Sequence, residues 1–216
     1  MPVVWLFDYD LTLYGPDEYE VLRRLDRNIT RFLQSRFKLS EAEADERRQA
    51  YWKEFGTTLA GLRTRFGVSP AEYFDFIHAG EGLIFPRANP ALRALLLSLP
   101  GDRWIFTNAR RDWTIKGLQS MGIEDCFDGI LDIESFGWVS KPHAGIYTKA
   151  EKRIHAAGKD IVFFDDRHEN LGPARAMGWR TVLVAPTPES LTDGWDLVLP
   201  RVLDLREKAD PSWFQV

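Results

Sequence analysis

Paired carboxylates stand at two places where a short apolar run of the chain ends. Asp8 and Asp10 follow the first such run, and Asp165 and Asp166 follow a later one. Carboxylates that gather at one site repel one another unless cations neutralise them. Because the chain has only four histidines, and oxygen ligands suit hard cations, we predict a Mg²⁺ site rather than a zinc site.

Three further polar residues carry groups that can hold a phosphate: Thr107, Asn108 and Lys141. A phosphomonoester is close to a dianion at neutral pH, because its second pKa lies near 6. A magnesium ion, the Lys141 ammonium, the Thr107 hydroxyl and backbone N–H groups after Asn108 can screen that charge. A carboxylate at Asp8 is then a workable nucleophile that forms an aspartyl-phosphate. Asp10 can protonate the leaving alkoxide and later take a proton from the hydrolytic water.

The runs before these residues predict strands that are buried on both faces of a sheet. They are rich in Val, Ile, Phe and Trp, lack a clean alternation, and span residues 3–7, 104–106, 161–164 and 181–185. Such runs are typical of parallel strands. Because ligands bind at the carboxyl edge of a parallel sheet, the polar residues should converge there. A last short strand is expected near residues 196–200.

Helical segments between the strands predict a doubly wound α/β core with a mostly parallel sheet. Asn89 and Asp112 are expected to cap two of these helices at their starts. Gly122 and Gly178 are expected to end two of them. The alternation of strand and helix therefore favours a Rossmann-like core.

The first connection of this core is too long for a single helix. Asp8 and Thr107 lie 99 residues apart, whereas a strand–helix–strand unit needs only about 30 residues. Apolar residues at helical spacing recur in the extra stretch. We therefore predict a helical cap domain at residues 16–86, inserted after the first strand of a core domain made of residues 1–15 and 87–216.

The candidate catalytic residues fall in segments that resemble the haloacid dehalogenase superfamily of phosphohydrolases. FDYDLTLY (7–14) is similar to its first motif, DxDxT, and IFTNA (105–109) to its second. Lys141 with the following proline resembles the third motif, and FFDDRHEN (163–170) the acidic fourth. With YWKEFGTTLAGL and GIEDCFDGI added, the chain resembles the pyrimidine 5′-nucleotidase branch over roughly residues 1–185.

This resemblance implies a role for each matching residue. Asp8 would be the nucleophile and a magnesium ligand. Asp10 would be the acid and base, with its backbone carbonyl on the magnesium ion. Thr107 and Lys141 would bind the phosphate group, with Asn108 beside them.

The acidic fourth motif would complete the metal site. Asp166 would be the direct ligand, with Asp165 beside it, because the family keeps an acid at that place while the preceding residue varies. Asn170 stands where many relatives carry another acid, and a supporting role behind the metal ligands is open to it.

The cap stretch YWKEFGTTLAGL offers groups that can recognise a base. Tyr51 can stack on it, and Lys53 and Thr57 can hydrogen-bond to its edge. The competing interpretation is that this face packs inside the cap. The sequence leaves both open.

The function expected from these features is the Mg²⁺-dependent hydrolysis of a pyrimidine nucleoside monophosphate, UMP or CMP, to nucleoside and phosphate. A phosphatase or phosphomutase for a sugar phosphate or phosphoglycolate is the alternative. A hydrolytic dehalogenase would not need Asp10 or the metal. A non-catalytic binding protein would be expected to lose at least one of four residues, and none is lost: Asp8, Asp10, Lys141 and Asp166.

The composition limits the partners of the chain. Its 216 residues carry a net charge of −4 with a pI of about 5.6, so no nucleic-acid partner is expected beside the small phosphorylated metabolite. No apolar run reaches membrane-spanning length. The single cysteine, Cys126, allows no internal disulfide and suits a reducing compartment, so a cytoplasmic location is expected. The oligomeric state stays open.

Overall fold

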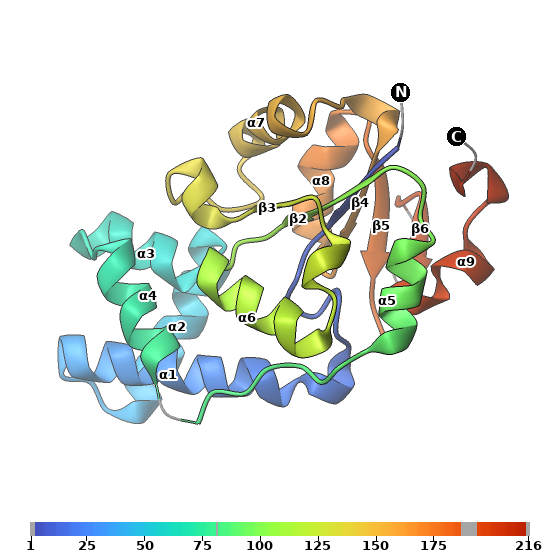
Figure 1. The fold of residues 1–216 in the computed structure, drawn as a ribbon. Helices are drawn as coiled ribbons and strands as arrows, with labels where there is room; N and C mark the ends of the chain where they lie inside the picture. Colours follow the sequence, from blue (N-terminus) through green and yellow to red (C-terminus); the bar gives the residue numbers. More distant parts are fainter. Residues whose placement is uncertain (1–2, 81, 187–193, 215–216) are drawn as a thin grey trace.

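A six-stranded sheet, in which neighbouring strands are parallel, forms the centre of the molecule (Figure 1). The computed structural model describes residues 3–80, 82–186 and 194–214. The strands lie in the order β3-β2-β1-β4-β5-β6. They span Val4–Phe7 (β1), Asp102–Phe106 (β2), Gly129–Leu131 (β3), Ile161–Asp165 (β4), Arg180–Val184 (β5) and Leu197–Leu199 (β6). This is the strand order of a doubly wound sheet, and the predicted fold class is confirmed.

Residues along β1 alternate between two hydrophobic clusters, one on each face of the sheet. Trp5 and Phe7 belong to one cluster, and Val4 and Leu6 belong to the other. All four side chains are buried. A strand that is covered on both faces needs apolar residues at every position, which explains the unbroken apolar run in the sequence.

Helices cover both faces of the sheet. On the cluster of Trp5 pack α5 (Pro90–Leu97), α6 (Arg111–Met121) and the short α9 (Leu205–Lys208). On the cluster of Leu6 pack α7 (Ala144–Ile154) and α8 (His168–Ala176). Short 3-10 helices lie at Pro16–Glu18, Glu124–Cys126, Ile133–Phe136, Gly158–Asp160, Val202–Asp204 and Pro211–Phe214.

Most of the predicted helix ends are confirmed. The side chain of Asn89 accepts a hydrogen bond at the start of α5. Gly122 ends α6 with a φ of 70°, and Gly178 follows α8 with a φ of 79°. The prediction that Asp112 caps α6 is wrong. The helix begins one residue earlier, and both carboxylate oxygens of Asp112 accept hydrogen bonds from the guanidinium of Arg110.

Four α-helices lie between β1 and α5 in the described residues: α1 (Glu20–Phe37), α2 (Glu41–Phe55), α3 (Thr58–Phe66) and α4 (Pro70–Ala79). Their buried side chains form a third hydrophobic cluster, which includes Phe32, Leu62 and Phe74. The first turns of α1 also reach the sheet, because Val21 packs in the cluster of Trp5. In Figure 1 these helices gather beside the sheet. The helical character predicted for residues 16–86 is confirmed, and we call this segment the cap.

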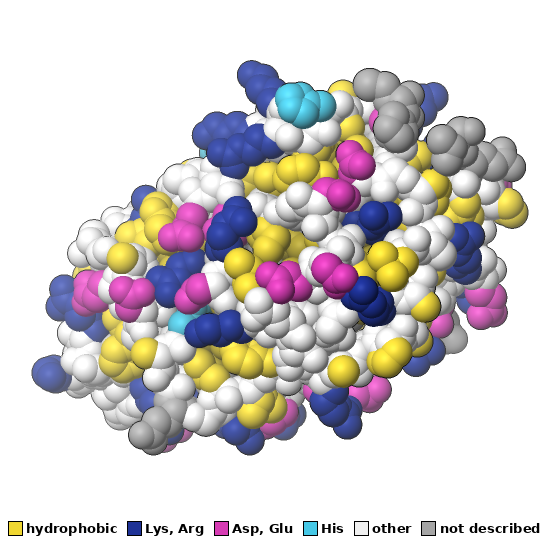
Figure 2. Space-filling view, viewed as in Figure 1, with side chains coloured by type: hydrophobic (Ala, Val, Ile, Leu, Met, Phe, Trp, Pro, Cys, Tyr) yellow, Lys and Arg dark blue, Asp and Glu magenta, His cyan; other side chains and the backbone are white. Residues whose placement is uncertain are grey.

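Charged side chains of both signs are interspersed on the face seen in Figure 2, and that face shows no continuous basic stripe. Among the helices described, none combines the length and the hydrophobicity of a membrane span.

Candidate active site

The carboxyl ends of β1 and β4 lie next to each other at the point where the strand order reverses. Phe7 is paired with Phe164 in the parallel register, and the backbone N–H of Asp8 donates a hydrogen bond of 2.9 Å to the Phe164 carbonyl. Asp8 and Asp165 are therefore brought to the same level of the sheet edge. Such a switch point is where open α/β sheets bind ligands.

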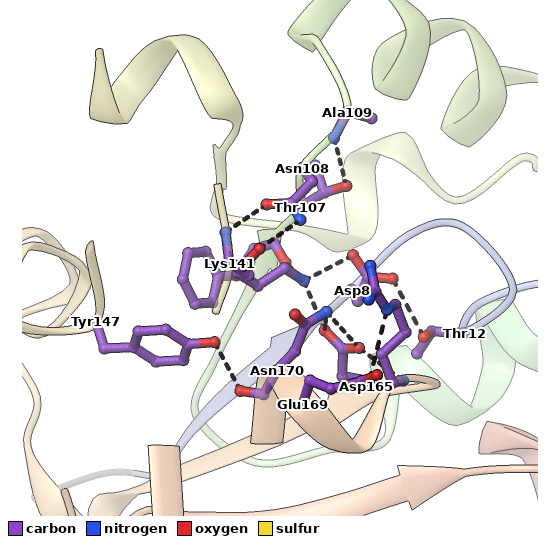
Figure 3. Close-up of polar contacts among 12 residues, drawn as sticks. Asp8, Thr12, Thr107, Asn108, Ala109, Lys141, Tyr147, Asp165, Glu169 and Asn170 are labelled. Carbon is purple, nitrogen blue, oxygen red and sulfur yellow. Dashed lines mark hydrogen bonds and ion pairs between the residues drawn. The ribbon is translucent and has the colours of Figure 1, made fainter. Parts of the chain in front are cut away.

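Lys141 reaches this edge from the loop after β3 and is completely buried (Figure 3). Its Nζ atom donates to Asp8 Oδ1 at 2.8 Å, to Asp165 Oδ2 at 2.6 Å and to the Phe106 carbonyl at 2.7 Å. These contacts use all three hydrogens of the ammonium. Burial alone would lower the pKa of Lys141, but the negative charges of Asp165 and Asp8 outweigh it, so the pKa is raised. Lys141 is therefore a permanent positive charge between the two acids.

The side chain of Asn108 fixes the backbone of Lys141. Its carbonyl oxygen accepts from the Lys141 N–H at 2.7 Å, and its amide donates to the Lys141 carbonyl at 3.2 Å. The amide of Asn108 is thus occupied within the protein. Thr107 is also buried, and its hydroxyl oxygen accepts from the N–H of Ala109 at 3.0 Å. The hydroxyl hydrogen of Thr107 remains free to donate to a ligand.

Asp8, Asp165 and Asp166 bring one carboxylate oxygen each to within 4.8 Å of one another. Burial raises the pKa of Asp165 and Asp166, and the neighbouring negative charges raise it further. A Mg²⁺ ion binds oxygens at about 2.1 Å and would neutralise these charges. The spacing and the chemistry of the three groups therefore fit the predicted ion.

Asp165 and Asp166 have different surroundings. Asp165 is fully buried and accepts from the backbone N–H of Arg167 at 2.9 Å and from the amide of Asn170 at 2.9 and 3.1 Å. Asp166 lines the cavity described below. The carbonyl oxygen of the Asn170 side chain is buried and has no hydrogen-bond partner among the described residues. That free acceptor fits a hydrated cation nearby.

Asp10 lines the same cavity as Asp8. Burial raises its pKa to about 7, and the negative charge of Asp8 adds to the shift, whereas a hydrogen bond from the Tyr14 hydroxyl opposes it. A carboxyl group with a pKa near neutrality can both give and take a proton. The sequence analysis assigned no role to Tyr14 or to Thr12, the threonine of the DxDxT motif, whose hydroxyl donates to Asp8 at 3.4 Å. Their spacing of four residues from Asp10 and Asp8 was the available signal.

A cavity of about 690 Å³ opens above these groups. Asp8, Asp10, Thr107 and Asp166 lie at its catalytic end, and residues of α1, α2, α3 and α4 form much of the remaining wall, together with core residues such as Trp113 and Arg167. A volume of this size is typical of sites for small molecules.

The three cap residues predicted to bind the substrate are placed differently from one another. Tyr51 is buried in the cap cluster, and Lys53 is exposed; neither lines the cavity. Thr57 does line the cavity, and its hydroxyl also accepts from the N–H of Ala60 at 3.1 Å at the start of α3. Trp52, which belongs to the same stretch, also lines the cavity.

Two arginines of the core, Arg167 and Arg110, contact the cap. The guanidinium of Arg167 lies 4.5 Å from the centre of the Trp52 ring, and its Nη1 donates to the Gly56 carbonyl at 3.1 Å. Arg110 pairs with Asp75 of α4 at 2.6 Å. Arg167 directly follows Asp166, so one of these contacts adjoins the acidic cluster.

The chain belongs to the haloacid dehalogenase-like hydrolases, because the model of that family matches residues 6–178. Phosphate metabolism protein 8 of Saccharomyces cerevisiae is 26% identical over 196 residues, which cover 83% of this chain and 60% of that protein. Bifunctional epoxide hydrolase 2 of Rattus norvegicus is 27% identical over 138 residues, which cover 62% of this chain and 24% of that protein. The chain thus spans less than two thirds of either relative.

Solved structures of the same superfamily share the fold. A HAD phosphatase from Thermococcus onnurineus superposes with a TM-score of 0.64 at 18% identity, covering 95% of this chain and 96% of that one. The HAD-hydrolase YfnB of Bacillus subtilis, bound to magnesium, gives 0.63 at 18% identity, covering 95% and 97%. L-2-haloacid dehalogenase from Xanthobacter autotrophicus gives 0.60 at 21% identity, covering 96% and 98%. Phosphatase and dehalogenase therefore share this architecture, and the fold does not choose between them.

Proposed function

We propose that the protein is a Mg²⁺-dependent phosphomonoester hydrolase that forms an aspartyl-phosphate on Asp8. The observation that carries this proposal is the position of Asp8 at the end of the cavity, with Lys141 and Thr12 on its two carboxylate oxygens and Asp10 on the same wall. A dehalogenase would need the nucleophile alone. A second carboxyl group with a pKa of about 7 on that wall suits a reaction that moves protons.

The acidic cluster is the proposed metal site. Asp8 and Asp166 would hold the ion through carboxylate oxygens, and Asp10 through its backbone carbonyl. Asp165, tied to Lys141 and Asn170, would keep the cluster in place. When bound, Mg²⁺ would neutralise negative charge on the phosphate oxygens and leave Asp8 free to approach the phosphorus atom.

The residues of the chain divide the proton and phosphoryl transfers between them. An oxygen of Asp8 attacks phosphorus, and the bond from phosphorus to the ester oxygen breaks. Asp10 gives its proton to that oxygen, so the leaving group departs as an alcohol. Asp10 then takes a proton from a water molecule, whose oxygen attacks the phosphorus atom and releases Asp8 and inorganic phosphate.

Throughout this sequence, groups of the chain hold the phosphoryl oxygens. The hydroxyl of Thr107 is the expected donor, and the ammonium of Lys141 supplies positive charge and would donate to the phosphate once it gives up one of its three present contacts. Both side chains are buried, so water competes weakly for the phosphate. Asn108 does not bind the phosphate directly but positions Lys141, because its amide fixes the backbone of that residue.

The proposed substrate is a pyrimidine nucleoside monophosphate, UMP or CMP. The similarity of the motifs to the pyrimidine 5′-nucleotidase branch supports it. So does the cavity, whose cap wall offers aromatic and aliphatic side chains that can pack on a flat base: Trp52, Tyr73, Phe74, Leu25 and Ile29. Sugar phosphates and phosphoglycolate are the alternative substrates.

A substrate panel tests the proposal. The purified protein is assayed with UMP, CMP, AMP, glucose 6-phosphate, 2-phosphoglycolate, p-nitrophenyl phosphate and 2-chloropropionate, with Mg²⁺ or with a chelator. We expect release of phosphate only with Mg²⁺, and the highest kcat/KM with UMP or CMP. Release of chloride without release of phosphate would show a dehalogenase. No product from any compound would contradict the proposed hydrolase.

A further inference from the structure

An ion pair lies on the cap wall of the cavity, on residues outside the catalytic motifs. Arg48 of α2 places Nη1 3.0 Å from Oδ1 of Asp26 on α1, and both residues line the cavity. The other nitrogens of Arg48 face Asp45, at 3.0 Å for Nε and 2.8 Å for Nη2. Asp45 does not line the cavity. The guanidinium therefore lies between one carboxylate that faces the cavity and one that does not.

The surroundings of Asp26 on the cavity wall are largely apolar. Its own helix contributes Leu22, Leu25 and Ile29 to the wall, and α4 contributes Tyr73, Phe74 and Ile77. Residues at this spacing share one face of α1, so Asp26 interrupts a hydrophobic stripe. A carboxylate in such a place loses hydration and needs compensating contacts.

Arg48 compensates only part of this loss. The side chain of Asp26 is still 42% exposed, against 19% for Arg48. Burial followed by the negative charge of Asp26 raises the pKa of Tyr73, which places that phenol close to the carboxylate. Asp26 therefore offers a hydrogen-bond acceptor to a molecule in the cavity.

The charge balance of this wall restricts the molecules that fit. Among the cap residues that the structure describes on the wall, Arg48 is the only arginine or lysine, and two carboxylates already neutralise it. A leaving group that carries a carboxylate would face Asp26 on this wall; the arginine on the core side of the cavity, Arg167, lies over Trp52 and pairs with Glu169 at 3.7 Å. A neutral group with O–H or N–H hydrogens can donate to Asp26 instead.

A second polar group on the cavity wall lies beside the catalytic carboxyl. The indole N–H of Trp113 is buried, lines the cavity and acts to lower the pKa of Asp10 against the effect of burial. It therefore belongs with the catalytic residues rather than with Asp26.

We propose that Asp26 and Arg48 form a subsite that selects phosphomonoesters with a neutral, hydroxyl- or amide-bearing leaving group and disfavours those with a carboxylate. This inference rests on the proposed phosphohydrolase function. Nucleosides and sugars have the selected chemistry. Phosphoglycolate and phosphoglycerate have the disfavoured chemistry, because an unpaired like charge placed against Asp26 reduces binding.

Isosteric variants of the pair test this subsite. For each variant, kcat/KM is measured with UMP and with 2-phosphoglycolate and divided by kcat/KM with p-nitrophenyl phosphate. Asp26→Asn removes the charge and keeps the shape. It should lower the UMP ratio about tenfold, the cost of one hydrogen bond to a charged group, and raise the phosphoglycolate ratio.

Arg48→Gln changes the charge in the opposite direction. It leaves Asp26 without its cation, so the phosphoglycolate ratio should fall below that of the wild-type protein. The matched control is Glu54→Gln, which removes a carboxylate of the same helix that pairs with Arg65 at 2.8 Å and does not line the cavity, and it should leave both ratios within about twofold. Melting temperatures show that each variant is folded.

The outcomes separate the subsite from the enzyme. Unchanged ratios in folded Asp26→Asn and Arg48→Gln, or equal changes in Glu54→Gln, would overturn the subsite while phosphate release with Mg²⁺ still supports the phosphohydrolase. A wild-type protein that hydrolyses no phosphomonoester, including p-nitrophenyl phosphate, would overturn both.

Discussion

The ammonium of Lys141 lies 2.8 Å from a carboxylate oxygen of Asp8, although 133 positions separate the two residues in the chain. The same ammonium binds Asp165, so one buried cation connects the ends of β1 and β4. This arrangement places positive charge beside the proposed nucleophile before any ligand arrives. A dianionic phosphate can approach Asp8 because the negative charge there is already compensated.

The first prediction concerns the nucleophile. Asp8→Asn keeps the size of the side chain but removes the anion, so no aspartyl-phosphate should form. Turnover of UMP should fall by about three orders of magnitude or more. Steady-state assays measure the loss, and mass spectrometry of the variant shows that the asparagine has not deamidated. More than a few per cent of wild-type activity in the intact variant would contradict the mechanism.

The second prediction separates attack from proton transfer. Asp10→Asn removes the carboxyl group that donates the proton but keeps the shape of the side chain. Hydrolysis of UMP, whose leaving alkoxide needs a proton, should fall more than that of p-nitrophenyl phosphate, whose phenolate needs none. The ratio of the two kcat values measures the effect. Equal losses with both substrates would show that Asp10 has only a structural role.

The third prediction follows from the charges of the acidic cluster. Burial raises the pKa of Asp10 to about 7 and also raises the pKa of Asp165 and Asp166. Such groups take up protons when the chain folds, so the free energy of unfolding falls as the pH rises from about 4 through the raised pKa values. The melting temperature of the metal-free protein should therefore fall between pH 5 and pH 8.

Magnesium should reverse that trend. It binds ionised carboxylates in the folded state, so it should raise the melting temperature more at pH 8 than at pH 5. Asp166→Asn should remove most of this stabilisation. The control Asp102→Asn changes an exposed carboxylate at the start of β2, at the opposite edge of the sheet, and should keep it. A full magnesium shift in Asp166→Asn would place the ion elsewhere.

The convergence of Asp8, Lys141 and Asp165 at one edge of the sheet could be predicted from the sequence, whereas parts of the fold could not. Unbroken apolar runs specify parallel strands, and parallel strands bring their carboxyl ends to one edge. Strand β3, by contrast, has only the three residues Gly129–Leu131 and no run that marks it. The capping role given to Asp112 was wrong because Arg110 binds that carboxylate. No local sequence pattern shows whether a carboxylate will bind the backbone N–H groups of a helix start or a neighbouring side chain.

The directions in which the side chains of the cap point could not be predicted from the sequence either. Neighbouring residues on a helix point about 100° apart, so the choice between Tyr51 and Trp52 depends on how α2 is rotated. That rotation is set by packing against α1 and α3. Tyr51 points inward, where a β-carbon at Gly61 would lie 2.7 Å from its ring. Trp52 points toward the cavity.

The fourth prediction tests the placement of Tyr51. Tyr51→Ala should lower the free energy of unfolding by about 3 kcal/mol, because it leaves a space in the cap cluster. The melting temperature should fall by roughly 6–12 °C, and the ratio of UMP to AMP hydrolysis should not change. Lys53→Ala, on the exposed face of the same helix, should change neither quantity. A changed substrate ratio in either variant would restore these residues as base contacts.

The last prediction concerns Trp52, which lines the cavity and stacks on Arg167. Trp52 is 50% exposed, so Trp52→Ala should lower the free energy of unfolding much less than Tyr51→Ala. If the base stacks on the indole, its removal would weaken binding by about 1–3 kcal/mol of stacking free energy, which corresponds to a five- to 150-fold fall in kcat/KM for UMP. With p-nitrophenyl phosphate the fall should be smaller, because that ester carries no nucleoside. Trp52→Phe keeps an aromatic face and should retain most of the activity on UMP. Equal losses with both esters in Trp52→Ala would assign Trp52 to holding Arg167 and closing the cavity, rather than to the substrate.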